Sequence, residues 1–370
     1  MRLEIERGDL LKALSHVTSV VERRTTIPIL SNVMLKASGN ALMFKATDLE
    51  RDVSESVDAK VQTPGALTVP AHMLHDIVRK LPEGAEIELK RDGDKERLTL
   101  TSGQSRFSLQ TLTAEDFPDL AVGEIGHEFV IDAADLKRLI EKTRFAISTE
   151  ETRYYLNGIY LHQARGADML RAVATDGHRL AQSDVALPQG AAGMPGVIVP
   201  RKTVLEVVKL LDGVEGDVEI ALSSSKVRFS MGGLVLTSKL IDGTFPDYER
   251  VIPRGNDKHL TADAKAFAAA VDRVSTISLE KSRAVKLAVS DGKMTLAVNN
   301  PDSGSAEEEL AVDYSKEPLE IGFNSRYLMD VAQQITAEAM RFEMQDAGSP
   351  TVVRDPDDAQ SLYVLMPMRV

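Results

Sequence analysis

The chain has 370 residues, of which 43% are hydrophobic, and it contains no cysteine. This length predicts two or three domains, and the lack of cysteine excludes disulfides, thiolate metal sites and cysteine nucleophiles. The formal net charge of −12 argues at first against nucleic-acid binding, because phosphate-binding surfaces are basic. No apolar run is long enough for a membrane span and the N-terminus shows no export signal, so we expect a cytoplasmic protein.

The first third of the chain alternates between helical and strand patterns. Asp9 is placed to cap a helix over 9–17, and Ser38-Gly39-Asn40 joins two alternating runs as a hairpin. Val69-Pro70 opens a second helix, with proline in the first turn, where its missing N–H costs nothing. The expected helices cover 9–17 and 71–81, and the expected strands cover 30–35, 41–46, 53–61, 87–89, 97–101 and 106–109.

The remaining two thirds follow the same order of elements. In the second third we expect helices over 133–145 and 201–211, with strands over 158–162, 169–175, 218–222, 226–230 and 234–240. In the last third we expect helices over 264–277 and 324–335, with strands over 284–290, 293–299, 308–314, 319–322, 340–344, 351–354 and 362–366.

Landmark residues recur at an interval of about 125 residues. Thr47-Asp48 returns as Thr175-Asp176 and, in weaker form, as Asn299-Asn300. Phe-Pro-Asp closes the first unit at 117–119 and the second at 245–247. A constant order of helix, turn and proline predicts three tandem copies of one α+β domain, each with two helices packed on antiparallel sheets. We place the domains at 1–124, 125–253 and 254–370.

The charge is distributed unevenly between the predicted elements. The six predicted helices together carry a small net positive charge, whereas the whole chain carries −12. The acidic excess therefore lies in strands and loops. One explanation is that basic residues simply favour helices, but glutamate favours helices too. The alternative is that the helices share a face that meets a polyanion through weak contacts that do not depend on sequence.

Catalysis has little support in the sequence. There is no Gly-x-Ser-x-Gly, no His-Glu-x-x-His and no glycine-rich phosphate loop after a strand. His72 and His75 have helical spacing but no third metal ligand is suggested, and Asp355, Asp357 and Asp358 lack the spacing of a calcium loop. We therefore expect neither enzyme activity, nor a metal, nor a cofactor. A scaffold that binds proteins but not DNA remains an alternative function.

Five motifs resemble the bacterial DNA polymerase III beta subunit family, the sliding clamps. They are RYYLNGIYL (153–161), AVATDGHRLA (172–181), VIVPRK (197–202), TSKLIDGTFPDYERVIP (237–253) and the C-terminal MPMRV (366–370). The resemblance runs the full length. It implies a DNA-clamp fold and a head-to-tail homodimer, two chains that close a ring around double-stranded DNA without sequence specificity. It also implies tethering of the replicative polymerase, the clamp loader and other clamp-motif proteins, and hence processivity.

The resemblance also implies site residues. A partner-peptide pocket would comprise Leu156, Thr175, Gly177, His178, Arg179, Leu180, Pro246, Arg250, Val251, Asn324, Tyr327, Val364, Met366, Pro367, Met368 and Arg369. DNA contacts would come from Arg24, Tyr154, Tyr155, Arg201 and Lys202. The dimer would pair Phe107 and Leu109 with Thr276 and Ile277. Flexible methionines suit an apolar wall that accepts several peptides.

Overall fold

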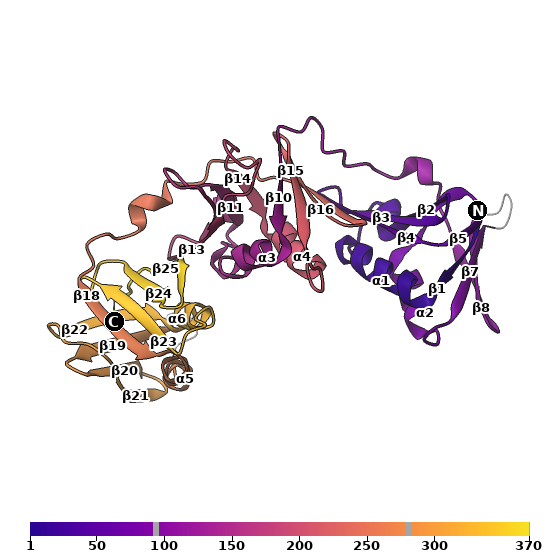
Figure 1. Ribbon diagram of the computed structural model, residues 1–370. Coiled ribbons are helices and arrows are strands. Elements are labelled where there is room, and N and C mark those ends of the chain that lie inside the picture. Colours follow the sequence, from indigo (N-terminus) through magenta and orange to yellow (C-terminus); the bar gives the residue numbers. More distant parts are fainter. Residues whose placement is uncertain (92–95, 279–282, 370) are drawn as a thin grey trace. The chain divides into compact units, whose positions relative to one another are not determined.

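The computed structural model describes residues 1–91, 96–278 and 283–369. The chain divides into two compact units, one made of 1–134, 188–191 and 202–240, the other of 135–187, 192–201 and 241 onward. Figure 1 labels most of the helices and strands of both units. Among the described residues, no helix is both long enough and apolar enough to cross a membrane.

The first repeat begins with a strand, a helix and a three-stranded meander. Its elements are β1 (Arg2–Glu6), α1 (Arg7–Val17), β2 (Asn32–Ser38), β3 (Ala41–Thr47), β4 (Arg51–Asp58), β5 (Lys60–Thr63), β6 (Gly65–Pro70), α2 (Ala71–Lys80), β7 (Glu86–Arg91), β8 (Arg97–Ser102) and β9 (Ser105–Gln110).

The second and third repeats follow the same plan. The second comprises β10 (His127–Asp132), α3 (Ala133–Glu141), β11 (Gly158–Gln163), β12 (Met169–Thr175), β13 (Arg179–Ala186), β14 (Val197–Pro200), α4 (Arg201–Leu210), β15 (Asp217–Leu222), β16 (Lys226–Met231) and β17 (Leu234–Lys239). The third comprises β18 (Lys258–Asp263), α5 (Ala264–Ser275), β19 (Ala284–Ser290), β20 (Lys293–Asn300), β21 (Gly304–Ala311), β22 (Leu319–Asn324), α6 (Ser325–Ala332), β23 (Ala339–Met344), β24 (Thr351–Asp355) and β25 (Asp358–Leu365). The expected α+β repeat is confirmed.

Several local predictions were wrong in their details. Glu6, not Asp9, caps α1, because its carboxylate accepts from the backbone N–H groups of Gly8 and Asp9. Pro70 stands at the cap of α2 instead of in its first turn. The strand expected over 53–61 is two strands, β4 and β5. The strands β1, β6, β10, β13, β14 and β18 were not predicted.

Edge-to-edge strand pairing joins successive repeats. In the first unit β4 pairs with β17, with Val53 opposite Leu236, inside the eight-stranded sheet β10-β15-β16-β17-β4-β3-β2-β6. In the second unit β13 pairs with β25, with Ala181 opposite Tyr363, inside the sheet β14-β11-β12-β13-β25-β24-β23-β18. The other two sheets, β5-β1-β7-β8-β9 and β21-β20-β19-β22, end at β9 and β21. These two strands are edges with no further partner in the described chain.

Helix faces and inward strand faces supply the cores. In the third repeat, Phe267 of α5 packs edge to face on Phe342 of β23, with ring centroids 5.2 Å apart, and both are buried. Such aromatic pairs favour this tilted geometry because of their ring quadrupoles.

We expect Phe342→Ala to destabilise the third repeat by about 3–5 kcal/mol, because it leaves a cavity against Phe267. Phe342→Leu, which keeps most of the volume, should cost less than half as much. Urea unfolding followed by circular dichroism measures both. Equal midpoints for the two variants would contradict a tightly packed ring pair.

Candidate functional site

The turn between β12 and β13 is fixed by its own side chains. The Thr175 hydroxyl donates to the carbonyl of Arg179 (2.6 Å) and accepts from the N–H of Gly177 (3.1 Å). The Asp176 carboxylate accepts from the N–H groups of His178 and Arg179 at 2.9 and 3.0 Å. Gly177 has φ +88°, which glycine adopts without steric cost. This turn exposes His178 and directs Arg179 inward.

The Arg179 guanidinium is buried and fully engaged inside the chain. It donates to Asp176 (3.1 Å), to the Phe145 carbonyl (2.6 Å) and to Asp330 of α6. Its carbon lies 4.3 Å from the ring centroid of Tyr327, within cation–π range. Arg179 therefore ties the second repeat to the third, and it positions the neighbouring surface instead of offering free donors.

An apolar cavity of about 180 Å³ lies beside this turn, within the second unit. Its floor is a buried cluster that includes Leu156, Leu180 and Val364. The full lining is Leu156, Thr175, Gly177, Arg179, Leu180, Pro246, Asp247, Tyr248, Val251, Val364 and Met366. A cavity with this lining can hold one or two apolar side chains of a ligand.

The structure thus brings together most, but not all, of the residues predicted for the pocket. Asp247 and Tyr248 were missed, although they directly follow Pro246 in the repeated Phe-Pro-Asp motif. The predicted residues that do not line the cavity are His178, Arg250, Asn324, Tyr327, Pro367, Met368 and Arg369.

Some of these outlying residues form a rim. The His178 and Tyr327 rings stack with centroids 6.5 Å apart. The C-terminal segment is held from two sides, because Met366 N–H donates to the His178 carbonyl (2.9 Å) and Met368 N–H donates to the Gly322 carbonyl (2.8 Å). Arg250 is highly exposed and pairs with Asp247 at 2.8 Å.

The equivalent joint in the first repeat is polar. Leu180 lies opposite Val364, whereas the corresponding pair is Asp52 and Thr237. Asp52 lies 3.0 Å from the ammonium of Lys45, and burial raises the pKa of this carboxyl although Lys45 opposes the shift. At the first joint, charged groups therefore occupy the positions that correspond to the apolar lining of the cavity in the second unit.

The residues predicted to contact DNA have mixed environments. Tyr154 and Tyr155 lie in a 3₁₀ helix (Glu151–Leu156) just before β11. Tyr154 is 54% exposed, whereas Tyr155 packs against the cluster below the cavity. Arg24 is exposed in a loop of the first unit, and Arg201 is exposed at the start of α4.

Lys202 and the histidines of α2 have identified partners. The Lys202 ammonium lies 3.3 Å from Glu22, in an exposed pair. His72 and His75 do not face a common ligand, because their Nε2 atoms lie 3.0 Å from the Val21 carbonyl and 3.2 Å from the Ser15 hydroxyl.

Two of the residues predicted for the dimer interface lie on the edge strand β9, and the other two lie just after α5. Phe107 and Leu109 are on β9, with Leu109 buried and Phe107 half-buried. Thr276 and Ile277 follow α5, and the Asn300 side chain, close to the start of β21, donates to the Ile277 carbonyl at 2.8 Å.

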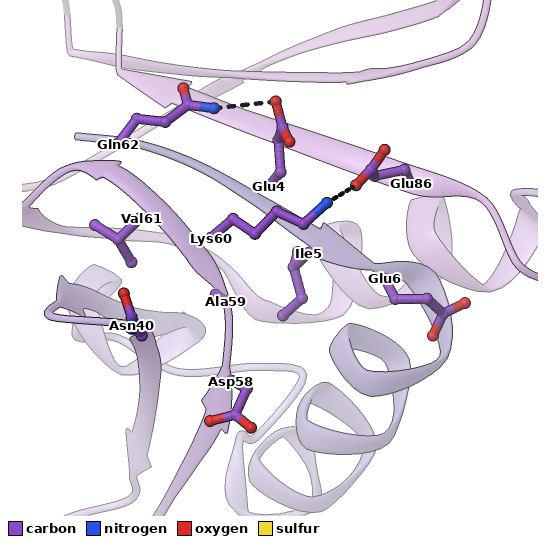
Figure 2. Close-up of a pocket in the computed structure, with 10 residues that line it drawn as sticks. All are labelled: Glu4, Ile5, Glu6, Asn40, Asp58, Ala59, Lys60, Val61, Gln62 and Glu86. Atoms are coloured by element: carbon purple, nitrogen blue, oxygen red, sulfur yellow. Dashed lines mark hydrogen bonds and ion pairs between the residues drawn. The ribbon is translucent and has the colours of Figure 1, made fainter.

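A second, wider hollow of about 690 Å³ lies on the first repeat. Figure 2 shows two pairs among its polar side chains, Lys60 with Glu86 at 2.7 Å and Gln62 with Glu4 at 3.0 Å. Because most residues that line this hollow are polar or charged, and four of them are paired with one another, we assign the candidate site to the apolar cavity of the second unit.

We expect Arg179→Lys to lower the free energy of unfolding by about 1–3 kcal/mol, because an ammonium cannot reproduce the forked contacts to Asp176, Asp330 and Phe145. The same change at exposed Arg250 should have no measurable effect. Chemical denaturation of both variants tests this difference. Equal losses would show that Arg179 does not tie the repeats together.

Comparisons with known proteins match the chain from end to end. Models of the DNA polymerase III beta subunit match at residues 1–121 (N-terminal domain), 130–247 (central domain) and 249–369 (C-terminal domain). The beta sliding clamp of Caulobacter vibrioides is 55% identical, with 100% of both chains covered.

Solved structures agree with this result. A Caulobacter crescentus beta sliding clamp with PEG bound is 55% identical at a TM-score of 0.97, covering 100% of this chain and 99% of that one. A Bartonella birtlesii sliding clamp bound to griselimycin is 54% identical at a TM-score of 0.97, with 100% of both chains covered. The chain belongs to the DNA polymerase III beta subunit family, the beta sliding clamps.

Proposed function

We propose that two copies of this chain close head to tail into a ring that encircles duplex DNA and slides along it. The apolar cavity tethers the replicative polymerase, the clamp loader and other partners, which confers processivity. The protein has no catalytic activity of its own, needs no cofactor and acts in the cytoplasm. The observation that carries the proposal is the repeated sheet joint, which leaves β9 and β21 as unmatched edges.

The two internal joints indicate how these free edges would pair. β9 corresponds in its repeat to β17 and β25, and β21 corresponds to β4 and β13. Exposed edges carry unpaired N–H and C=O groups that favour a further strand. Since β9 and β21 belong to opposite ends of the chain, their pairing between copies is heterologous, and such contacts form rings when the rotation closes.

The register of the internal joints also carries over. It sets Phe107 opposite Ala306, and Arg106 opposite Glu307, in the partner copy. The first pair continues the inward apolar face, with Ile277 held close to β21 through Asn300. The second pair brings opposite charges together on the exposed face, a favourable cross-strand contact.

For DNA we propose contacts by Arg24, Tyr154, Tyr155, Arg201 and Lys202. The basic residues among them are exposed, and Lys202 has only a solvent-screened pair with Glu22. A few such contacts give weak binding that ignores sequence and falls with salt. Retention would then depend on ring closure and not on adhesion, which is compatible with the overall negative charge.

We expect the double variant Ser108→Cys, Ser305→Cys to form a covalent ring on oxidation, because the transferred register puts these two serines opposite each other. No other thiol can form a crosslink, since the chain itself has no cysteine. Non-reducing electrophoresis and light scattering give the mass. Either single variant should stay uncrosslinked, and a covalent dimer from Ser108→Cys alone would mean head-to-head pairing instead.

We expect the same double variant, oxidised in the presence of nicked circular plasmid, to remain on the DNA during gel filtration at about 1 M NaCl, a concentration that strips phosphate contacts. Cutting the circle with a restriction enzyme should release the protein. If neither circular nor linear DNA of the same sequence retains the protein, the ring does not enclose DNA. The protein is then a scaffold for protein partners alone.

A further inference from the structure

An ion pair lies against the wall of the apolar cavity. The Glu150 carboxylate accepts two hydrogen bonds from Arg153, at 2.6 Å from Nη2 and 2.8 Å from Nε. Gly177 lines the cavity, and a Cβ at Gly177 would collide with Nη1 of Arg153. The absence of a side chain at Gly177 therefore lets the guanidinium reach the rim.

This pair is held loosely compared with Arg179. Side chains of Arg153 and Glu150 are 31% and 52% exposed, and exposed pairs contribute little to stability. The hydrogen bonds from Arg153, with the nearby His178, lower the pKa of Glu150, so this carboxylate stays charged at neutral pH. A ligand carboxylate can replace it, because one charge-assisted pair is exchanged for another.

We propose that Arg153 binds an acidic side chain of partner segments and that Glu150 competes for the same guanidinium when the cavity is empty. A segment that carries this acid beside its apolar anchors displaces Glu150 as the anchors enter the cavity and pack on Leu180 and Val364. The competition from Glu150 then sets how strongly the cavity prefers a segment with an acidic side chain over a neutral one. This inference rests on the proposed partner-binding role of the cavity.

The test uses two fluorescein-labelled, C-terminally amidated decapeptides with two adjacent leucines, preceded by aspartate in one and asparagine in the other. Fluorescence anisotropy gives their Kd values. We expect Glu150→Gln to lower the Kd of the aspartate peptide about three- to tenfold. The Kd of the asparagine peptide should change by less than about twofold. Arg153→Gln should erase the preference between the peptides.

Glu151→Gln is the matched control, because it removes the same charge one residue along without touching the pair. It should bind both peptides as the parent chain does. If Glu150→Gln lowers the Kd of both peptides equally, Glu150 does not compete with the acidic side chain for Arg153. The same conclusion follows if Glu151→Gln lowers the Kd of the aspartate peptide as much as Glu150→Gln does. A preference seen only when the peptide ends in a free carboxylate would overturn the assignment to an acidic side chain.

The partner-binding role is tested separately by a chain that ends at Leu365 and so lacks the Met366 wall. This truncated chain should bind neither peptide. If it binds both with unchanged affinity, or if the parent chain binds neither, the cavity is not the partner site. Binding to the parent chain without any discrimination by charge would instead overturn the role of Arg153 and Glu150 alone.

Discussion

Edge-to-edge pairing between successive repeats is the interaction on which the rest of the structure depends. A strand edge exposes backbone donors and acceptors that are costly to leave unpaired away from water. β4 with β17, and β13 with β25, satisfy these groups and make one sheet from two repeats. In the described part of the chain, β9 and β21, the strands that correspond to the two joining strands, have no such partner. These open edges support the proposed pairing between two copies of the chain.

The turn before each joining strand makes this pairing specific. Thr47 and Asp48 in the first repeat form the same side-chain bonds as Thr175 and Asp176 in the second. In both repeats the turn delivers an arginine into the joint, where it binds groups of the following repeat: Arg51 the carbonyl of Lys202, and Arg179 the carboxylate of Asp330. A short local motif thus fixes a contact between distant parts of the chain.

Equivalent joints nevertheless differ in polarity, and under the proposed function this difference decides which joint binds a partner. Asp52, Lys45 and Lys239 place charges at the first joint, with Lys239 2.9 Å from Glu50. Leu180 and Val364 keep the second joint apolar and leave room for ligand side chains. Apolar surface gains from burial under a ligand, whereas paired charges would lose their partners. One backbone plan therefore gives a structural joint in one place and a pocket in another.

The sequence by itself determined the triplication, the helices and the Thr-Asp-Gly turn, because each depends on spacing within a few residues. It could not reveal β13, whose residues are buried almost throughout and include Gln182, Ser183 and Asp184, so no alternation marks the strand. Tertiary structure alone decided that Arg179 binds Asp330 and that Arg153 lies against Gly177. Those contacts depend on strand register and on segments far apart in the chain, which local patterns do not encode.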